Sequence, residues 1–290
     1  MTNTKQNTTQ NTTQNATTDG QKTLVIGGTG KSGRRVAERL VARGVPVRVG
    51  SRSGTPAFVW EDPDTWDAAL DGVDAVYVTY YPDLSFPGAA EQIGAFAKLA
   101  VSRGARRLVL LSGRGEEGAV VSEDALKDSG ADWTVLRASF FAQNFSEDFF
   151  LEPVLSGEIV LPTADAVEAF VDLDDLADVA VEALTDPRHA GRTYELSGPR
   201  LLSFGQVAEE LSKATGREIR YVPVSKEEYR AALEQQGMPG EFAELFESVL
   251  DGRNAHLVPG VREALGREPR DFAEYAREAA ATGVWTVQEH

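Results

Sequence analysis

A glycine-rich stretch, Thr23–Val36, constrains the fold more than any other part of the sequence. The apolar run Leu24–Ile26 stops at a cluster of glycines, and a helical pattern follows in which Val36 and Leu40 share one face. An apolar run that ends in glycines and continues with apolar residues at helical spacing indicates a strand, a tight turn and a helix. This unit is expected to begin the folded part of the chain.

The three glycines of the turn, Gly27, Gly30 and Gly33, have a G-x-x-G-x-x-G spacing. The first would let the chain turn, the second would let a pyrophosphate approach the backbone, and the third would let the helix pack closely on the strand. An ordinary turn is the alternative, but the strand before and the helix after it favour nucleotide binding. The loop residues expected to contact the nucleotide are Gly27, Gly28, Thr29, Gly30, Lys31, Ser32 and Gly33.

The end of the second predicted strand, Val45–Val49, bears on which dinucleotide is bound. Acidic residues are absent from positions 40–57, where an acid would hold the ribose hydroxyls of NAD, and Ser51 and Arg52 stand there instead. An arginine at this position accommodates the 2′-phosphate of NADP, and Lys31 offers a second cation. A solvated surface arginine is the alternative. The pattern favours NADP(H) over NAD(H).

Two further residues are assigned to the cofactor site. Phe58–Trp60 is predicted to be a short third strand, and Asp62 after it either accepts the adenine amino group or caps the next helix. Asp74–Thr79 is predicted to be the fourth strand. Thr79 ends it, at the edge where such sheets bind ligands.

Strands continue to alternate with helices through the first two thirds of the chain. This alternation predicts an α/β fold, a Rossmann-type doubly wound parallel sheet with a smaller C-terminal α/β lobe. Residues 21–199 would form the first lobe, with 141–170 contributing to the substrate cleft, and 200–290 the second. Later strands are expected at 107–111, 132–137, 170–172, 193–196 and 219–222, and helices at 87–103, 122–129, 174–184, 203–215, 227–236, 241–250 and 272–281. Residues 1–20, almost all Asn, Thr and Gln, are expected to be disordered.

Composition excludes several classes of function. The formal net charge of −16 repels phosphate backbones, so no nucleic-acid partner is expected. The chain has no cysteine, and its three histidines are scattered, so no metal site is expected. No apolar run approaches the roughly 18 residues of a membrane span. We therefore expect no membrane association and a cytoplasmic location, and oligomeric state stays open.

Aromatic residues follow two of the predicted strands. Tyr80 and Tyr81 come directly after the fourth strand, where they either line a ligand site or pack beneath the second lobe. Phe140, Phe141 and Phe145 follow the sixth strand. We predict that an apolar pocket for a small aromatic molecule contains Tyr80, Tyr81, Phe86, Phe140, Phe141, Asn144 and Phe145.

The chain resembles the NmrA-like branch of the atypical short-chain dehydrogenases/reductases. The motifs that carry the resemblance are 27–36, 70–76, 129–137, 140–145 with its Gln143-Asn144 pair, 170–177 and 265–272. The resemblance implies a Rossmann lobe, NAD(P) binding and a small C-terminal lobe. It does not imply one activity, because members include reductases of quinones and dyes, enzymes that tailor aromatic polyketides, and redox sensors that bind regulators.

The sequence departs from that family at the catalytic pair. Active short-chain dehydrogenases usually carry Tyr-x-x-x-Lys after a serine that Ser112 matches, but residues 118–130 contain no tyrosine. Many NmrA-like chains keep a lysine where this chain has Ala119, four residues before Glu123. Lys127, one turn further on, fits a solvated helix lysine better than a catalytic one.

Two functions are consistent with this departure. The first is an NADP(H)-dependent oxidoreductase for a bulky aromatic carbonyl or quinone, with a role in aromatic polyketide tailoring as one option. Tyr80, Tyr81 and Ser112 are then its candidate catalytic residues. The alternative is a catalytically silent dinucleotide sensor that binds a regulatory protein. A third option is a tailoring enzyme that uses the nucleotide only for structure.

Overall fold

A computed structural model of the chain describes residues 22–163, 165–235, 237 and 251–287. The Asn/Thr/Gln-rich segment 1–20 and the helix predicted at 241–250 lie outside these residues. No helix in the described ranges is both long and apolar enough to cross a membrane.

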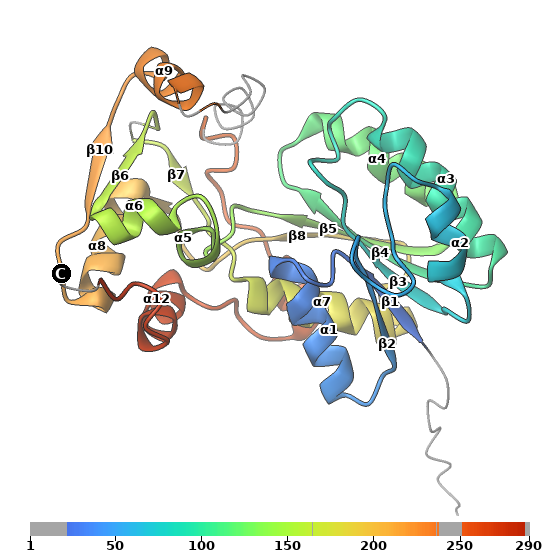
Figure 1. Cartoon of the computed structure of the whole chain (residues 1–290). Coiled ribbons are helices and arrows are strands. Elements are labelled where there is room, and N and C mark those ends of the chain that lie inside the picture. Colours follow the sequence, from blue (N-terminus) through green and yellow to red (C-terminus); the bar gives the residue numbers. More distant parts are fainter. Residues whose placement is uncertain (1–21, 164, 236, 238–250, 288–290) are drawn as a thin grey trace, which may run out of the picture.

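Six strands form the central sheet, in the order β2-β1-β3-β4-β5-β8, and every neighbouring pair is parallel. The strands are β1 (Thr23–Ile26), β2 (Val47–Gly50), β3 (Ala75–Val78), β4 (Arg107–Gly113), β5 (Asp132–Ala138) and β8 (Arg192–Leu196). Helices cover both faces of the sheet (Figure 1). The predicted Rossmann-type doubly wound architecture is therefore confirmed.

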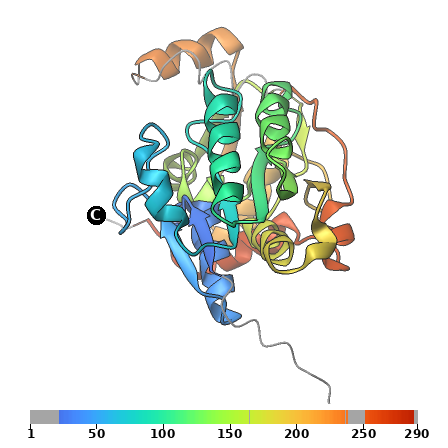
Figure 2. The ribbon, with the colours of Figure 1, turned by 90° about the vertical axis from the view of Figure 1, so that its right-hand side faces the viewer.

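Helices α1 (Lys31–Ala42) and α7 (Leu173–Thr185) cover one face of this sheet, and α2 (Asp64–Leu70), α3 (Ala89–Ser102) and α4 (Glu117–Lys127) cover the other. On the second face α3 and α4 lie side by side (Figure 2). The short 3-10 helix η1 (Pro187–His189) and α11 (Gly260–Leu265) pack near α7.

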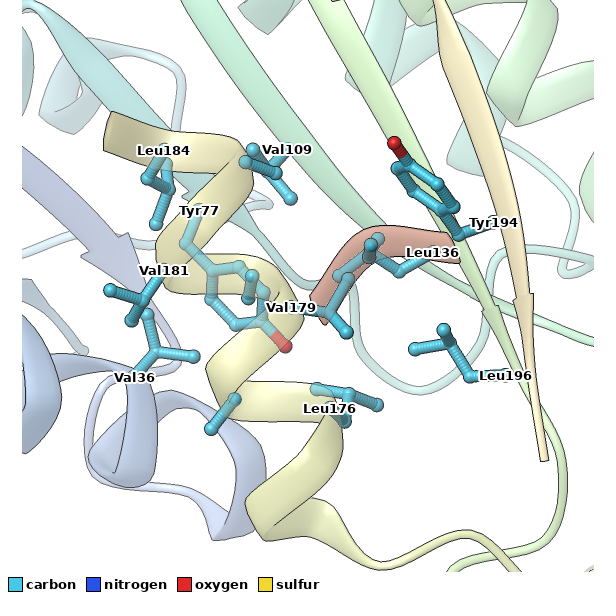
Figure 3. Packing of buried hydrophobic residues seen from close by; sticks show 14 of the residues in the cluster. Val36, Tyr77, Val109, Leu136, Leu176, Val179, Val181, Leu184, Tyr194 and Leu196 are labelled. Atoms are coloured by element: carbon cyan, nitrogen blue, oxygen red, sulfur yellow. The ribbon is translucent and has the colours of Figure 1, made fainter. Parts of the chain in front are cut away.

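The core between α1, α7 and the sheet follows the helical spacing of the sequence. Val36 of α1 and Val181 of α7 point toward the ring of Tyr77 on β3, and all three side chains are fully buried (Figure 3). Complete burial of one such aliphatic side chain stabilises the fold by about 2 kcal/mol. This packing fixes the position of α1, whose N-terminus carries the glycine turn.

The second lobe joins segments that lie far apart along the chain. Strand β6 (Glu158–Leu161) pairs in parallel with β10 (Arg220–Pro223), and β7 (Val167–Glu168) pairs antiparallel with β9 (Leu202–Ser203). Its helices are α5 (Asn144–Glu147), α6 (Leu151–Ser156), α8 (Phe204–Thr215), α9 (Lys226–Gln235) and α12 (Phe272–Ala281). Helix α8 begins with a capping box, in which Ser203 and Gln206 bond each other's backbone N–H groups. The predicted boundary between the lobes at residues 199 and 200 stays a prediction. Strand β6 lies before that boundary in the sequence but pairs with β10, which lies after it.

Two predicted strands are wrong. Phe58–Trp60 is a loop, because Phe58 and Trp60 are drawn into an aromatic cluster with Trp66 and Phe96, at ring-centroid distances of 5.0–6.5 Å. The segment 170–172 does not return to the central sheet. Val171 instead forms an isolated parallel bridge with Phe141, in the segment that follows β5.

Candidate active site

The glycine turn lies where the strand order of the sheet changes direction. Strand β1 has β2 on one side and β3 on the other, so the connections after β1 and β3 diverge at their carboxyl ends. The Thr79 hydroxyl donates a hydrogen bond of 3.0 Å to the Ile26 carbonyl across this point. Gly27 has a φ of +67°, and a Cβ there would lie 2.5 Å from the Thr79 Oγ1. The predicted turning role of Gly27 is confirmed.

The other two glycines place the start of α1 against the turn. A Cβ on Gly33 would lie 2.2 Å from the Gly27 carbonyl oxygen, so only glycine allows this close packing. Gly30 is the N-cap residue, and no side chain caps the helix. The first N–H groups of α1 are therefore available to an anion, and the helix dipole favours one.

A pocket opens beside this turn, between the ends of β1 and β2. We call it the β2 pocket, and it is lined by Ile26, Gly27, Thr29, Gly30, Gly50, Ser51, Arg52, Phe58, Val59, Trp60, Glu61, Thr79, Tyr80 and Tyr81. Arg52 is exposed, and nothing in the described ranges forms a hydrogen bond or ion pair with its guanidinium. The predicted residues Thr29, Gly30, Ser51, Arg52 and Thr79 thus meet in one place.

Five predicted cofactor residues do not line the β2 pocket: Gly28, Lys31, Ser32, Gly33 and Asp62. The Lys31 ammonium bonds the Asn144 Oδ1 at 2.7 Å and forms an ion pair with Asp148, so it does not serve as a second cation beside Arg52. The Asp62 carboxylate accepts the backbone N–H of Asp64 at 3.3 Å before α2, whose N-cap residue is Pro63, and Glu61 lines the pocket instead. Gly28 packs on Val49, and Ser32 is buried in α1.

A second pocket opens at the carboxyl ends of β3, β4 and β5. We call it the β4 pocket, and it is lined by Thr79, Tyr80, Asp83, Leu84, Leu111, Ser112, Gly113, Arg114, Glu116, Ala138, Ser139, Phe140, Phe141, Asn144 and Asn254. It shares Thr79 and Tyr80 with the β2 pocket. The two pockets therefore adjoin, and together they line this edge of the sheet.

Three residues predicted for an apolar pocket do not line the β4 pocket. Tyr81 is 73% exposed and belongs to the β2 pocket. Phe145 is fully buried in the aromatic core of the second lobe, stacked on Phe150 at a centroid distance of 5.0 Å. Phe86 lies outside both pockets, in the loop before α3. Phe145 is buried because the chain turns into α5 directly after Phe141.

The Ser112 hydroxyl is held by a buried acid. It donates a hydrogen bond of 2.8 Å to Glu123, which also receives two bonds of 2.8 Å from Arg137. Burial opposes ionisation of Glu123, but the bonds from Arg137 and Ser112 outweigh it and leave the pKa of this carboxyl below its ordinary value. The hydrogen of Ser112 is thus directed away from the pocket.

The Tyr80 hydroxyl also has a partner, since it donates to the Gln92 Oε1 at 2.9 Å. Burial, followed by the charges of Glu61 and Glu91, raises the pKa of Tyr80 above its ordinary value. A tyrosine with a raised pKa holds its proton more firmly, so Tyr80 is a weaker acid here than in water.

Sequence reasoning missed five polar residues of the β4 pocket, Asp83, Arg114, Glu116, Ser139 and Asn254. Glu116 stands three residues after β4, and burial with the negative charge of Asp83 raises its pKa to about 7, against the charge of Arg253. Arg114 is buried and donates to Ser139 at 3.1 Å. The signal for both was available, because they follow a strand at its carboxyl end.

Asn254 is the missed residue that lies furthest along the chain. Its amide donates to the Arg114 carbonyl at 3.0 Å across 140 positions of sequence. No local pattern indicates a contact of this range.

Comparison with known proteins identifies the family. A family model described as NAD(P)H-binding matches residues 27–187, and the model of the NmrA-like family matches residues 121–276. The first match begins at the glycine turn, contains strands β2 to β5 and extends through α7. The second spans α4 to α12 and so includes the second lobe.

Individual relatives agree with these matches. Prestalk A differentiation protein A of Dictyostelium discoideum is 32% identical over 276 residues, covering 88% of this chain and 91% of its own length. The NAD(P)H azoreductase of Xenophilus azovorans is 31% identical over 284 residues, covering 89% and 98%. The structure of Citrobacter sp. triphenylmethane reductase complexed with NADP(H) superposes with a TM-score of 0.71 at 21% identity, covering 89% and 99%. The chain belongs to the NmrA-like family of NAD(P)H-binding proteins.

Proposed function

We propose that this chain is an NADPH-dependent reductase of a bulky aromatic acceptor, a carbonyl compound or a quinone. The observation that carries the proposal is the junction of the two pockets at Thr79 and Tyr80. One pocket holds the glycine turn, and the other combines aromatic walls with convergent polar groups. The same junction would bring the reducing end of a dinucleotide to the acceptor.

The residues of the β2 pocket fit a dinucleotide. The uncapped start of α1 leaves N–H groups for the pyrophosphate, and Gly30 adds no side chain that would block its approach. Trp60 and Tyr81 contribute aromatic surfaces to the lining of the pocket. When bound, the reduced nicotinamide would supply a hydride to the acceptor.

The end of β2 favours the phosphorylated cofactor. Arg52 has no acidic partner in the described part of the chain, and Ser51 beside it offers a hydroxyl. An unpaired guanidinium attracts the 2′-phosphate of NADPH and gives no comparable bond to the hydroxyl of NADH. Because Lys31 is engaged with Asp148, Arg52 is the residue on which this preference depends.

The walls of the β4 pocket favour an aromatic acceptor. Phe140, Phe141 and Tyr80 supply ring surfaces, and Leu84 and Leu111 supply aliphatic ones. Such a pocket excludes water from a hydride transfer and orients a flat molecule, whereas Ser139, Asn144 and Asn254 offer polar contacts to its oxygens. Relatives named as a dehydrogenase and as reductases support the same class of reaction.

The alternative, a silent sensor with a protein partner, requires no acceptor pocket. A sensor would not need the β4 pocket to bind an acceptor, and we therefore prefer the reductase. An aromatic polyketide is one acceptor that the pocket walls would suit.

The test is the loss of nicotinamide absorbance when the purified protein meets NADPH with quinones, aromatic ketones and a triphenylmethane dye. Cofactor carrying deuterium at C4 follows the hydride, and deuterium in the product is the expected result. Tight NADPH binding without turnover across the whole panel would overturn the proposal in favour of the sensor.

A further inference from the structure

The side chain of Glu116 is placed at the β4 pocket by its packing against Gly113. Glu116 is the N-cap residue of α4 but gives that helix no side-chain hydrogen bond. Its carboxyl instead folds back over Gly113 at the end of β4, where a Cβ on Gly113 would lie 2.0 Å from the carboxyl carbon. The absence of a side chain at Gly113 therefore creates the space for this carboxyl at the edge of the β4 pocket.

The Glu116 carboxyl also has no hydrogen-bond or ion-pair partner among the described residues. By contrast, Glu123 on the same helix is bound by Ser112, Lys127 and Arg137. Two acids on one helix thus differ in role. The first has a free carboxyl in the pocket, and the second stabilises the structure behind it.

Charged groups around Glu116 act in opposite directions. Asp83, from the loop after β3, lines the same pocket and disfavours the ionised form of Glu116. Arg253 approaches from the segment before α11 and favours it, but its guanidinium forms an ion pair with Asp251 at 2.8 Å and bonds the Gly115 carbonyl. Burial raises the pKa of Glu116 most, the charge of Asp83 adds to it, and the balance leaves Glu116 able to hold a proton near neutral pH.

We propose that Glu116 is the proton donor for the reduction, in place of the missing tyrosine. This rests on the proposed function. The acceptor gains a hydride with its electron pair from reduced nicotinamide, and its oxygen takes the hydrogen of the Glu116 carboxyl, which becomes a carboxylate. Solvent then returns a proton to that carboxylate. An acid whose pKa lies near the working pH suits this role.

The two alternative donors in the β4 pocket are less suited. The Ser112 hydrogen is bound to Glu123, and the Tyr80 hydrogen is bound to Gln92. Release of either proton would first break a bond of 2.8–2.9 Å. Glu116 needs no such step.

The decisive experiment compares two acceptors in wild type and Glu116→Gln. A neutral quinone must gain a proton, whereas a cationic triphenylmethane dye becomes neutral by taking a hydride alone. We expect Glu116→Gln to lower kcat for the quinone by roughly 100-fold or more. Its turnover of the dye should fall far less, so the ratio of the two rates changes. Glu117→Gln, an exposed neighbour on α4, is the matched control and should keep the wild-type ratio.

Two further measurements do not depend on turnover. Infrared titration of the protein without cofactor should show a carboxyl band that is missing in Glu116→Gln and titrates near the pKa of about 7. In Asp83→Asn that titration should move to lower pH, because a neighbouring negative charge is removed.

Gly113→Ala, which displaces the carboxyl without removing it, should change the acceptor ratio in the same direction as Glu116→Gln.

The outcomes separate the two proposals. Equal losses on both acceptors, or no loss on the quinone, would overturn the role of Glu116 and leave the reductase intact. A wild-type protein that turns over neither acceptor would overturn the reductase, and the donor role with it.

Discussion

The Ser112 hydroxyl lies 2.8 Å from the Oε1 of Glu123 and donates its hydrogen to that fully buried carboxylate. Arg137 completes the arrangement with two bonds to the same group. The serine that the sequence resemblance aligns with a catalytic position is therefore part of a buried ionic network that joins β4, α4 and β5. Its role in this chain is open to a direct test against Glu116.

Substitution of Ser112 by alanine should affect stability more than chemistry. The change removes one hydrogen bond to a charged group, which we expect to lower the free energy of unfolding by about 2 kcal/mol. Quinone turnover should fall much less than in Glu116→Gln, because the hydroxyl hydrogen is directed into the network. Urea denaturation and quinone kinetics on the two variants test this. A loss of turnover in Ser112→Ala that equals the loss in Glu116→Gln would make the serine the better donor candidate.

Loss of the Glu123 charge should be more damaging. Glu123→Gln removes the carboxylate charge beside Arg137, and among the described residues the remaining acidic partner of this partly buried guanidinium is Glu195 at 3.6 Å. Breaking a buried ion pair costs about 3–5 kcal/mol. We expect a loss in this range by urea denaturation, and a value below 1 kcal/mol would mean that the network contributes little.

The two glycines at the start of α1 should separate folding from cofactor binding. Gly33→Ala places a Cβ 2.2 Å from the Gly27 carbonyl oxygen, so the turn must distort, at a cost of about 2 kcal/mol in stability. Gly30→Ala meets the same oxygen at 3.2 Å, which the loop tolerates better, but its Cβ stands where a pyrophosphate would approach. We expect a lowered Tm in the first variant and a near wild-type Tm with weakened NADPH binding in the second. Calorimetry and fluorescence titration measure the two quantities.

Arg52 should decide between the two dinucleotides. Arg52→Asp removes the unpaired guanidinium and adds a charge that repels the 2′-phosphate, so NADPH affinity should fall by roughly 100-fold while NADH affinity changes little. Arg192→Asp is the matched control, because Arg192 is also exposed but begins β8 at the opposite edge of the parallel sheet. Equal losses for both cofactors in Arg52→Asp would contradict the 2′-phosphate assignment.

The residues changed in these variants also show which parts of the site can be predicted from the sequence. Gly33 is predictable because a local motif imposes its contact with Gly27, and the order of strand and helix around it follows from hydrophobic spacing. Arg52 is predictable for the same reason, since it follows a recognisable strand. Each of these inferences needs only residues within a short window.

Phe145 and Asn254 show where local reasoning ends. An aromatic run after a strand is equally consistent with a pocket wall and with a lobe core, and only the turn into α5 sends Phe145 to the core while Phe140 and Phe141 stay at the pocket. Asn254 reaches Arg114 from 140 positions away. The Phe58–Trp60 loop reads as a strand because its buried aromatic residues have the composition of one.

Glu168 supplies a prediction about pH and stability. This carboxyl on β7 is 1% exposed, and neither of its oxygens has a hydrogen-bond partner among the described residues. Burial raises its pKa to about 7, despite the positive charge of Arg114 nearby. The folded protein therefore holds a proton between about pH 4.5 and 7 that the unfolded chain releases, so this group's contribution to stability falls as pH rises through that window.

The measurement is the free energy of unfolding of wild type and Glu168→Gln at pH 5 and pH 8. Glutamine keeps the shape of the side chain and does not ionise, so the wild type should lose about 2 kcal/mol more than the variant between the two values. Taking the difference between the proteins cancels other groups that titrate in the same range, Glu116 included. Glu263→Gln, which removes an acid from the short helix α11, serves as the charge control and should follow the wild type. Parallel pH dependence in wild type and Glu168→Gln would mean that Glu168 is ionised at its buried position, stabilised by the guanidinium of Arg114.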